Sequence, residues 1–245
     1  MTKTNINNQI QNQKQKYAII TGCNRGIGQG ILNSLLTENY FVFALNRTKS
    51  KITNKNYQEI ICDVSNSKEI KQAVKQILKQ TTKINLLVPN AAIRRFNNIG
   101  SFKEEDWNQS IDTNLNSVFH LTNQLIKSII EAKGSIIIVG SHSEKYPFAT
   151  GSAYCSTKAA LKSFCDCLLE EVRDQGVKVT YLSIGAVKNR DHGYDETWKL
   201  TPQDIGNFIV SLTKMNPRAL ASYIDLRPAK PLRETKQGIE KLQYL

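Results

Sequence analysis

The sequence has no long hydrophobic run. No window holds the roughly 18 uninterrupted apolar residues that a membrane-spanning helix requires. Residues 1–16, MTKTNINNQIQNQKQK, also lack the apolar core of a secretory signal peptide. We therefore expect no membrane partner, and we expect residues 1–16 to form a polar, disordered tail.

Cysteines are few and fit no disulfide or metal pattern. The five lie at positions 23, 62, 155, 165 and 167, which is an odd number without a C-x-x-C spacing. This pattern predicts reduced thiols, a cytoplasmic location and no metal site.

Nucleic-acid-binding motifs are absent as well. The formal net charge is +12, but the basic residues are scattered, and the densest run is only NRTKSK at 46–51. Neither paired cysteine and histidine motifs nor an RNP sequence occurs. The charge permits anionic partners such as nucleotides, phosphorylated cofactors or acidic carrier proteins, and we expect no nucleic-acid partner.

Short apolar runs alternate with amphipathic helical patterns along the chain. Such runs indicate strands that are buried on both faces, and the alternation predicts an α/β fold. Its core would be a doubly wound parallel sheet of about seven strands with helices on both faces. Thr201 followed by Pro202 marks the start of a late helix. The expected strands are 17–21, 41–45, 59–62, 84–88, 135–140, 178–184 and 221–226.

A glycine-rich turn, TGCNRGIG, follows the first expected strand and leads into a helix that ends near Asn39. Gly22, Gly26 and Gly28 would let the backbone approach a pyrophosphate, while the helix N-terminus supplies N–H groups and a positive dipole. The spacing differs from the commoner G-x-G-x-x-G, and a turn needed only for packing is the alternative. The position nevertheless predicts a dinucleotide-binding turn.

The end of the second strand, ALNRT, indicates which dinucleotide binds. An acidic residue there would hydrogen-bond the ribose 2′-OH of NAD, whereas an arginine would favour the 2′-phosphate of NADP. Asn46 stands where the acid is expected, Arg47 follows it, and Arg25 lies in the glycine turn. We therefore expect NADP(H) to be favoured over NAD(H). The alternative is that one or both arginines are merely solvated.

Tyr154 and Lys158, in SAYCSTKAA, are four residues apart and share one helix face. In a cleft, an ammonium about 4 Å away lowers a tyrosine pKa by up to about three units, close to 7. The phenol then becomes a useful acid or base near neutral pH. On a solvated surface the same pair would have no chemical role.

With TGCNRGIG in front and YCSTK behind, the chain resembles the short-chain dehydrogenase/reductase family over about residues 17–226. The resemblance implies a single Rossmann-type domain over 17–228, followed by a tail or short helix over 229–245. It also implies a homodimer or homotetramer. The implied catalytic residues are Asn114, Ser141, Tyr154 and Lys158. The implied cofactor-binding residues are Gly22, Asn24, Arg25, Gly26, Ile27, Gly28, Arg47, Asp63, Val64, Asn90, Ala91, Tyr154, Lys158, Gly185, Val187 and Asn189.

The activity that the resemblance implies is hydride transfer between NADP(H) and a carbonyl or alcohol substrate. Tyr154 would donate a proton to the carbonyl oxygen, and Ser141 would hydrogen-bond the same oxygen. Lys158 would favour tyrosinate and hold the nicotinamide ribose, while Asn114 would fix a helix kink and a water. The sequence departs from the family pattern at Ile184, Asn189 and Ala92, where proline, threonine and glycine are usual.

Other readings of the same residues stay open. A regulatory protein on this fold would sense NADP without turnover. His142 beside Ser141 hints at a serine hydrolase, but no G-x-S-x-G elbow is present. His192 and Tyr194 could line the substrate pocket or lie in a mobile loop. Arg94 and Arg95 could attract an anionic substrate or an acidic carrier protein, or could be plain surface charge.

Overall fold

The fold is described from a computed structural model of the 245-residue chain. The structure describes residues 15–189 and 197–230. Most of the two expected tails, residues 1–14 and 231–245, lies outside the described residues. The same holds for two candidate pocket residues, His192 and Tyr194.

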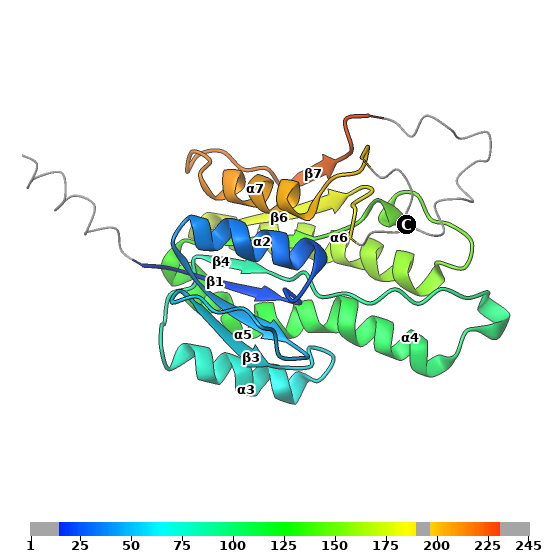
Figure 1. The fold of residues 1–245 in the computed structure, drawn as a ribbon, viewed down its shortest axis with the longest axis horizontal. Helices are drawn as coiled ribbons and strands as arrows, with labels where there is room; N and C mark the ends of the chain where they lie inside the picture. The colour runs from blue at the N-terminus through cyan, green and yellow to red at the C-terminus, as the bar shows by residue number, and fades with distance from the viewer. Residues whose placement is uncertain (1–14, 190–196, 231–245) are drawn as a thin grey trace, which may run out of the picture.

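One parallel sheet of seven strands forms the centre of the molecule (Figure 1). Its spatial order is β3 (Tyr57–Ile61), β2 (Tyr40–Asn46), β1 (Lys16–Thr21), β4 (Leu86–Val88), β5 (Ser135–Val139), β6 (Lys178–Ile184) and β7 (Tyr223–Leu226). Each of the six neighbouring strand pairs runs parallel. The strand order reverses between β1 and β4, and ligands bind in such sheets beyond the carboxyl ends of the strands at that point. The predicted sheet is confirmed.

Helices cover both faces of the sheet (Figure 1). α2 (Gly26–Thr37) and α7 (Pro202–Thr213) pack on one face, and α3 (Ser67–Leu78), α5 (Ser117–Ala132) and α6 (Ser152–Val172) pack on the other. The doubly wound arrangement that the sequence predicts is therefore confirmed. The remaining helical segments are short: η1 (Ile99–Ser101), α4 (Glu104–Ile111), η2 (Asp112–Asn116), η3 (His142–Glu144) and η4 (Arg173–Gln175).

Alternation within each strand supplies the two halves of the core. Along β1, Ile19 joins the cluster under α3, α5 and α6, whereas Ala18 and Ile20 join the cluster under α2 and α7. Successive side chains of a strand point to opposite faces, and here both faces are covered. This is why the strands read as continuous apolar runs in the sequence.

α7 begins as the sequence predicts. The hydroxyl of Thr201 accepts a hydrogen bond from the backbone N–H of Asp204, and the Asp204 carboxylate accepts one from the backbone N–H of Thr201. Pro202 occupies the first helical turn, where its missing N–H costs nothing. This capping box fixes the point at which the chain, returning from β6, enters the helix.

The two helices on that face approach each other at glycines. A Cβ added to Gly30 would lie 2.0 Å from the Pro202 carbonyl oxygen, and one added to Gly206 would lie 2.3 Å from the Gly30 oxygen. Neither distance is possible for a real side chain, so this contact requires both glycines. It brings the start of α7 against α2, the helix that follows the glycine turn.

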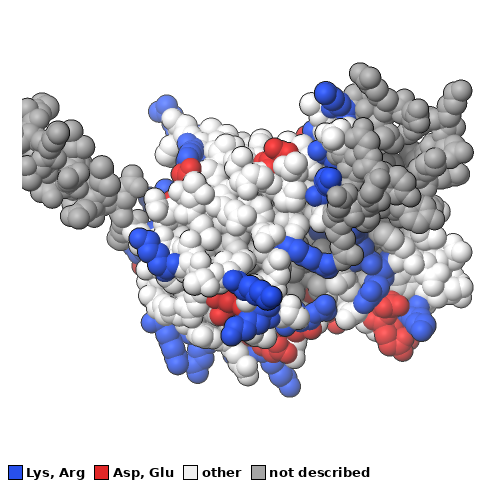
Figure 2. Space-filling model, in the orientation of Figure 1, with Lys and Arg blue, Asp and Glu red and all other residues white. Residues whose placement is uncertain are grey.

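The surface carries its excess of basic residues in a dispersed form. Figure 2 shows Lys and Arg side chains spread over one face, with Asp and Glu side chains between them. Among residues 15–189 and 197–230, no helix is long and apolar enough to cross a lipid bilayer.

Candidate active site

The glycine turn has a backbone that only glycine fits well. Gly22 and Gly26 have φ values of 69° and 56°, in the left-handed region. A Cβ added to Gly28 would lie 2.1 Å from the Gly22 carbonyl oxygen and 2.7 Å from Nδ2 of Asn90. The turn is therefore closed tightly against the end of β4.

The N-terminus of α2 is open to an anion. Arg25 precedes the helix without a side-chain capping bond, and the first turn contains no acidic residue. Ile27, in that turn, packs partly against the core below α2. The first N–H groups and the positive end of the helix dipole are thus left for an external negative group.

The ends of β1 and β4 are joined by a buried threonine that sequence reasoning missed. Oγ1 of Thr21 accepts hydrogen bonds from the backbone N–H groups of Asn90 and Ala91, both at 2.9 Å. Nδ2 of Asn90 donates to the carbonyl oxygens of Thr21 and Gly22 at 2.9 and 3.0 Å. The predicted residues Asn90 and Ala91 therefore lie directly against the glycine turn.

Asn46, at the end of β2, turns inward rather than toward solvent. Its Oδ1 accepts a hydrogen bond from the backbone N–H of Cys23 at 2.8 Å, and its Nδ2 donates to Oε1 of Glu59 at 2.8 Å. Burial raises the pKa of Glu59, but hydrogen bonds from Asn46, Ser50 and Tyr57 lower it overall. The amide is thus held between the glycine turn and an ionised carboxylate.

Arg25 and Arg47 lie on two exposed loops that are tied together. Nδ2 of Asn24 donates hydrogen bonds to the carbonyl oxygen and the hydroxyl of Thr48, at 2.5 and 3.2 Å. Both arginines are exposed, and neither side chain has an ion pair or hydrogen bond within the described part of the chain. Their guanidinium groups are available to an anion at this corner.

The acidic residue after β3 has local partners. Oδ1 of Asp63 accepts hydrogen bonds from the backbone N–H and hydroxyl of Ser65, at 2.9 and 2.7 Å. Its own N–H donates to Glu69. Asp63 is half-buried, while Val64 beside it is buried in the core. Both residues follow the carboxyl end of β3, two strands from β1.

The segment that follows β6 contacts the glycine turn at the carboxyl ends of the strands. A Cβ added to Gly26 would lie 2.9 Å from Oδ1 of Asn189, so the two residues are in contact. Val187 forms a bridge with Leu200 at the entrance to α7. Gly185 donates its N–H to the carbonyl oxygen of Leu226 at 2.9 Å. Residues from both halves of the chain thus converge at one site.

Tyr154 and Lys158 lie on α6 beside the carboxyl end of β5. Nζ of Lys158 is 5.8 Å from the centre of the Tyr154 ring and donates a hydrogen bond to the carbonyl oxygen of Val139 at 2.8 Å. Lys158 is buried and Tyr154 is half-buried. Ser141, just beyond β5, lies close enough to the Tyr154 phenol to lower its pKa. The structure therefore brings these three predicted residues together.

Asn114, the fourth predicted catalytic residue, lies in the π-helical turn η2. Its Oδ1 accepts from the N–H of Ile93 at 2.8 Å, and its Nδ2 donates to the Ile93 carbonyl oxygen and to Oγ1 of Thr157. The expected helix irregularity is present, and turns of this kind occur often at functional sites. Through Thr157, Asn114 contacts the turn of α6 that carries Lys158.

The pKa values of the pair differ from the expectation drawn from sequence. Burial raises the pKa of Tyr154, and a hydrogen bond with Ser141 and the charge of Arg94 oppose it only in part. Burial lowers the pKa of Lys158 to about 8. Burial is the main cause of both shifts, and the charge of Lys158 is not among the causes that lower the pKa of Tyr154. The expectation that Lys158 brings the Tyr154 pKa close to 7 is wrong for the free protein.

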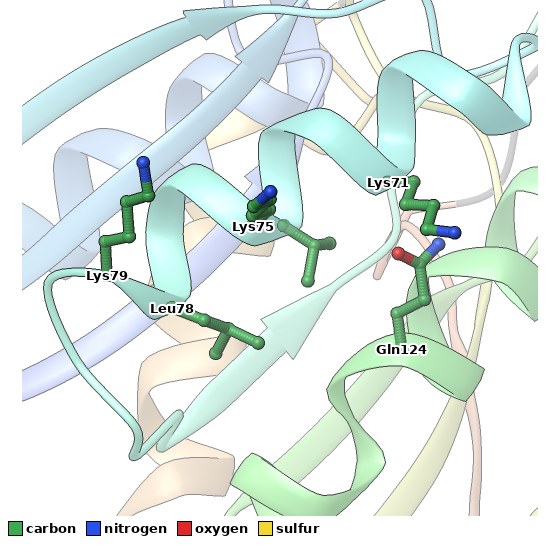
Figure 3. A pocket seen from close by; sticks show the side chains of 6 residues that line it. Lys71, Lys75, Leu78, Lys79 and Gln124 are labelled. Atoms are coloured by element: carbon green, nitrogen blue, oxygen red, sulfur yellow. The ribbon is translucent and has the colours of Figure 1, made fainter.

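A separate surface groove runs between α3 and α5 (Figure 3). Lys71, Lys75 and Leu78 come from α3, Lys79 directly follows that helix, and Gln124 of α5 lies opposite Lys71. None of these residues is among the predicted site residues. The groove is therefore distinct from the site at the strand ends.

Comparison with known proteins identifies the family from the sequence, and solved structures share the fold. A family model described as short chain dehydrogenase matches residues 16–198. The chain is 31% identical over 182 residues to a 3-oxoacyl-[acyl-carrier-protein] reductase of Buchnera aphidicola. The aligned region covers 71% of this chain and 74% of that protein.

Two solved structures illustrate the likeness of fold. An alcohol dehydrogenase from the archaeon Thermococcus sibiricus, complexed with 5-hydroxy-NADP, matches with a TM-score of 0.80 and 22% identity, over 91% of this chain and 100% of that one. A 3-ketoacyl-(acyl-carrier-protein) reductase from Brucella melitensis, complexed with NADH, matches with a TM-score of 0.75 and 21% identity. This match covers 86% of this chain and 96% of that one. One of these structures contains an NADP derivative and the other contains NADH. The matches therefore do not show whether this chain prefers NADP(H) or NAD(H).

Proposed function

Because the chain belongs to the short-chain dehydrogenase family, and is thus an oxidoreductase, we propose that it transfers a hydride between NADP(H) and a ketone or aldehyde, or the matching alcohol. One observation carries the proposal. Tyr154, Ser141 and Lys158 lie beside the carboxyl end of β5. The glycine turn follows the carboxyl end of β1, at the same end of the sheet. An acid and a hydrogen-bond donor thus lie at the carboxyl ends of the strands, where ligands bind in sheets of this kind.

The residues at the strand ends fit a dinucleotide. The N-terminus of α2 has no side-chain cap and no acidic residue in its first turn, so its N–H groups and positive dipole fit a pyrophosphate. When bound, the dinucleotide supplies or accepts the hydride. The residues that would hold it are Gly22, Asn24, Arg25, Gly26, Ile27, Gly28, Arg47, Asp63, Val64, Asn90, Ala91, Gly185, Val187 and Asn189, with Tyr154 and Lys158 at the reacting end.

The side chains around the reacting carbonyl have separate tasks. Tyr154 donates its proton to the substrate oxygen, and Ser141 orients that oxygen by a second hydrogen bond. Lys158 binds the ribose end of the dinucleotide and, when charged, stabilises the tyrosinate that remains. Asn114 hydrogen-bonds Ile93, in the loop after β4, and Thr157, in α6. It thereby fixes the position of that loop relative to α6.

The preference for NADP(H) rests on two arginines. Replacement Arg47→Ala is expected to raise the dissociation constant of NADPH about tenfold, because one charge-assisted contact with the 2′-phosphate is lost. Binding of NADH, which lacks that phosphate, is expected to stay unchanged. Fluorescence titration of both cofactors measures this. Lys49→Ala, at another exposed cation two residues on, is the matched control. An equal loss for NADH and NADPH would contradict the assignment of Arg47.

We also propose that copies of the chain associate through α5 and α6. Phe119, on α5, is 49% exposed although it is large and apolar. Phe119→Asp is expected to convert the oligomer into a monomer, because a charge would be buried at the contact. Light scattering measures the mass. Ile99→Asp, at an exposed apolar residue outside both helices, should leave the mass unchanged. A wild-type monomer would rule the association out.

The experiment that tests the activity is cofactor consumption against a panel of ketones and aldehydes, with NADPH and NADH in parallel. We expect turnover with NADPH on part of the panel. NADPH binding without turnover on any compound would instead favour a protein that senses the cofactor. A clear preference for NADH would overturn the argument from the arginines.

A further inference from the structure

Glu59 is a carboxylate beside the loop of Arg47, and the proposed function gives it no role. It lies on β3, next to β2 in the sheet. Its Oε1 accepts hydrogen bonds from Nδ2 of Asn46 at 2.8 Å and from the backbone N–H of Ser50 at 3.0 Å. Oε2 shares the Ser50 N–H at 3.0 Å, and the Tyr57 phenol donates to Oε1 at 3.2 Å. One carboxylate thus holds both ends of the segment 46–50.

The segment 46–50 is also tied to the glycine turn. Oδ1 of Asn46 accepts a hydrogen bond from the backbone N–H of Cys23 at 2.8 Å. Nδ2 of Asn24 donates a hydrogen bond to the carbonyl oxygen of Thr48 at 2.5 Å. Hydrogen bonds therefore fix the start, the middle and the end of this segment against the strand ends.

Glu59 holds the segment without neutralising Arg47. All the donors to the carboxylate are neutral groups, and within residues 15–189 and 197–230 no lysine or arginine forms an ion pair with it. The guanidinium of Arg47 is exposed and stays available to an anion. A loop that is already fixed loses less conformational entropy when its arginine binds a ligand.

The same contacts withdraw Asn46 from a cofactor. A hydrogen-bond acceptor at the end of β2 would bind the ribose 2′-OH of NAD. Asn46 is only 2% exposed, and its amide is engaged by Cys23 on one side and by Glu59 on the other. The end of β2 therefore offers a ligand the cation of Arg47 instead of an acceptor.

We propose that Glu59 is a positioning residue for cofactor choice. It fixes the segment 46–50 so that Arg47 binds the 2′-phosphate of NADP(H), and it holds Asn46 away from the ribose of NAD(H). This inference rests on the proposed function for the identity of the cofactor. The fixing of the segment, however, is a property of the free protein and is measurable without any ligand.

Fluorescence titration of both cofactors tests the selection. Glu59→Gln replaces one acceptor oxygen with an N–H donor, and Glu59→Asp keeps the charge but shortens the reach. Each variant should raise the dissociation constant of NADPH about fivefold, less than the loss of Arg47 itself, and should not weaken NADH binding. Unchanged or tighter NADPH binding in either variant, or an equal loss for NADH, would overturn the proposal.

Two further variants show whether Glu59 acts through Arg47. Glu38→Gln, at a carboxylate that pairs with Lys214 at the C-terminus of α2, is the matched control and should change neither affinity. In an Arg47→Ala background, Glu59→Gln should cause no further loss of NADPH affinity, because the side chain that it positions is absent. A further loss as large as in the wild-type background would overturn the proposal.

Amide hydrogen exchange followed by NMR measures the segment in the free protein. The N–H of Ser50 should exchange about tenfold faster in Glu59→Gln than in the wild type. The N–H of Gly22, bonded to the Leu45 carbonyl oxygen at 2.9 Å, should keep its rate and is the internal control. Unchanged exchange at Ser50 would overturn the proposal. Equal wild-type affinities for NADPH and NADH would defeat the proposed cofactor preference, while the exchange at Ser50 would still decide whether Glu59 fixes the segment.

Discussion

Tyr154→Phe is expected to lower kcat by about 10³-fold, the loss typical of removing a general acid. The ring remains, so its edge-on packing against Phe96, at 6.1 Å between centres, is kept. The transferable proton and the interaction of the phenol with Ser141 disappear. Steady-state rates on the best substrate of the panel measure the loss.

Binding of NADPH to Tyr154→Phe should remain close to wild type, because the glycine turn and the two arginines are untouched. Tyr146→Phe is the matched control, since its phenol is exposed and hydrogen-bonds Arg227 away from the reacting pair. Its rates should equal those of the wild type. Full activity in Tyr154→Phe would refute the role of the phenol as the acid.

Lys158→Met is expected to abolish most turnover and, at the same time, to make the protein more stable at pH 7. The activity falls because the ammonium no longer stabilises the tyrosinate or binds the ribose. The stability rises because an ammonium that is only 3% exposed is replaced by an apolar chain of similar length. A site that destabilises its own fold is typical of catalytic residues.

The size and pH window of the stability gain follow from the pKa. Burial lowers the pKa of Lys158 from 10.5 to about 8, which corresponds to at most about 3 kcal/mol of destabilisation below pH 8. Between pH 8 and 10.5 the unfolded chain holds this proton and the folded chain does not, so wild-type stability rises with pH there. The lost hydrogen bond to Val139 reduces the net gain to about 1–2 kcal/mol.

Denaturant unfolding of both proteins at pH 7 and pH 10 measures this effect. The advantage of Lys158→Met should be large at pH 7 and small at pH 10. Lys162→Met is the control, because Lys162 is on the same helix but partly exposed and paired with Asp166. A Lys158→Met protein that is less stable than wild type at pH 7 would contradict the buried, costly charge.

Much of the fold follows from local signals in the sequence. The seven apolar runs become the seven strands because both faces of the sheet are covered, and Thr201 with Pro202 starts α7 through interactions only a few residues apart. The glycine turn is also readable, because its left-handed backbone at Gly22 and Gly26 excludes most other residues. Each of these features can be predicted from residues that are close together in the sequence.

The interactions that sequence reasoning missed join distant parts of the chain. Asn46 looks like a cofactor-facing residue, but Glu59, on the neighbouring strand, and Cys23 turn its amide inward. Glu144 accepts a hydrogen bond from Tyr223 of the last strand, and no local pattern in the sequence predicts that pair. The pKa of Tyr154 depends on burial, which spacing along the chain does not give.

The most direct test of the central claim is the transfer of deuterium from NADPH deuterated at C4 of the nicotinamide to the carbonyl carbon of the substrate, followed by mass spectrometry. The account predicts one deuterium on that carbon in the wild-type product and almost no labelled product with Tyr154→Phe, although the variant binds NADPH. Labelled product formed equally by both proteins, or none formed by the wild type, would contradict it.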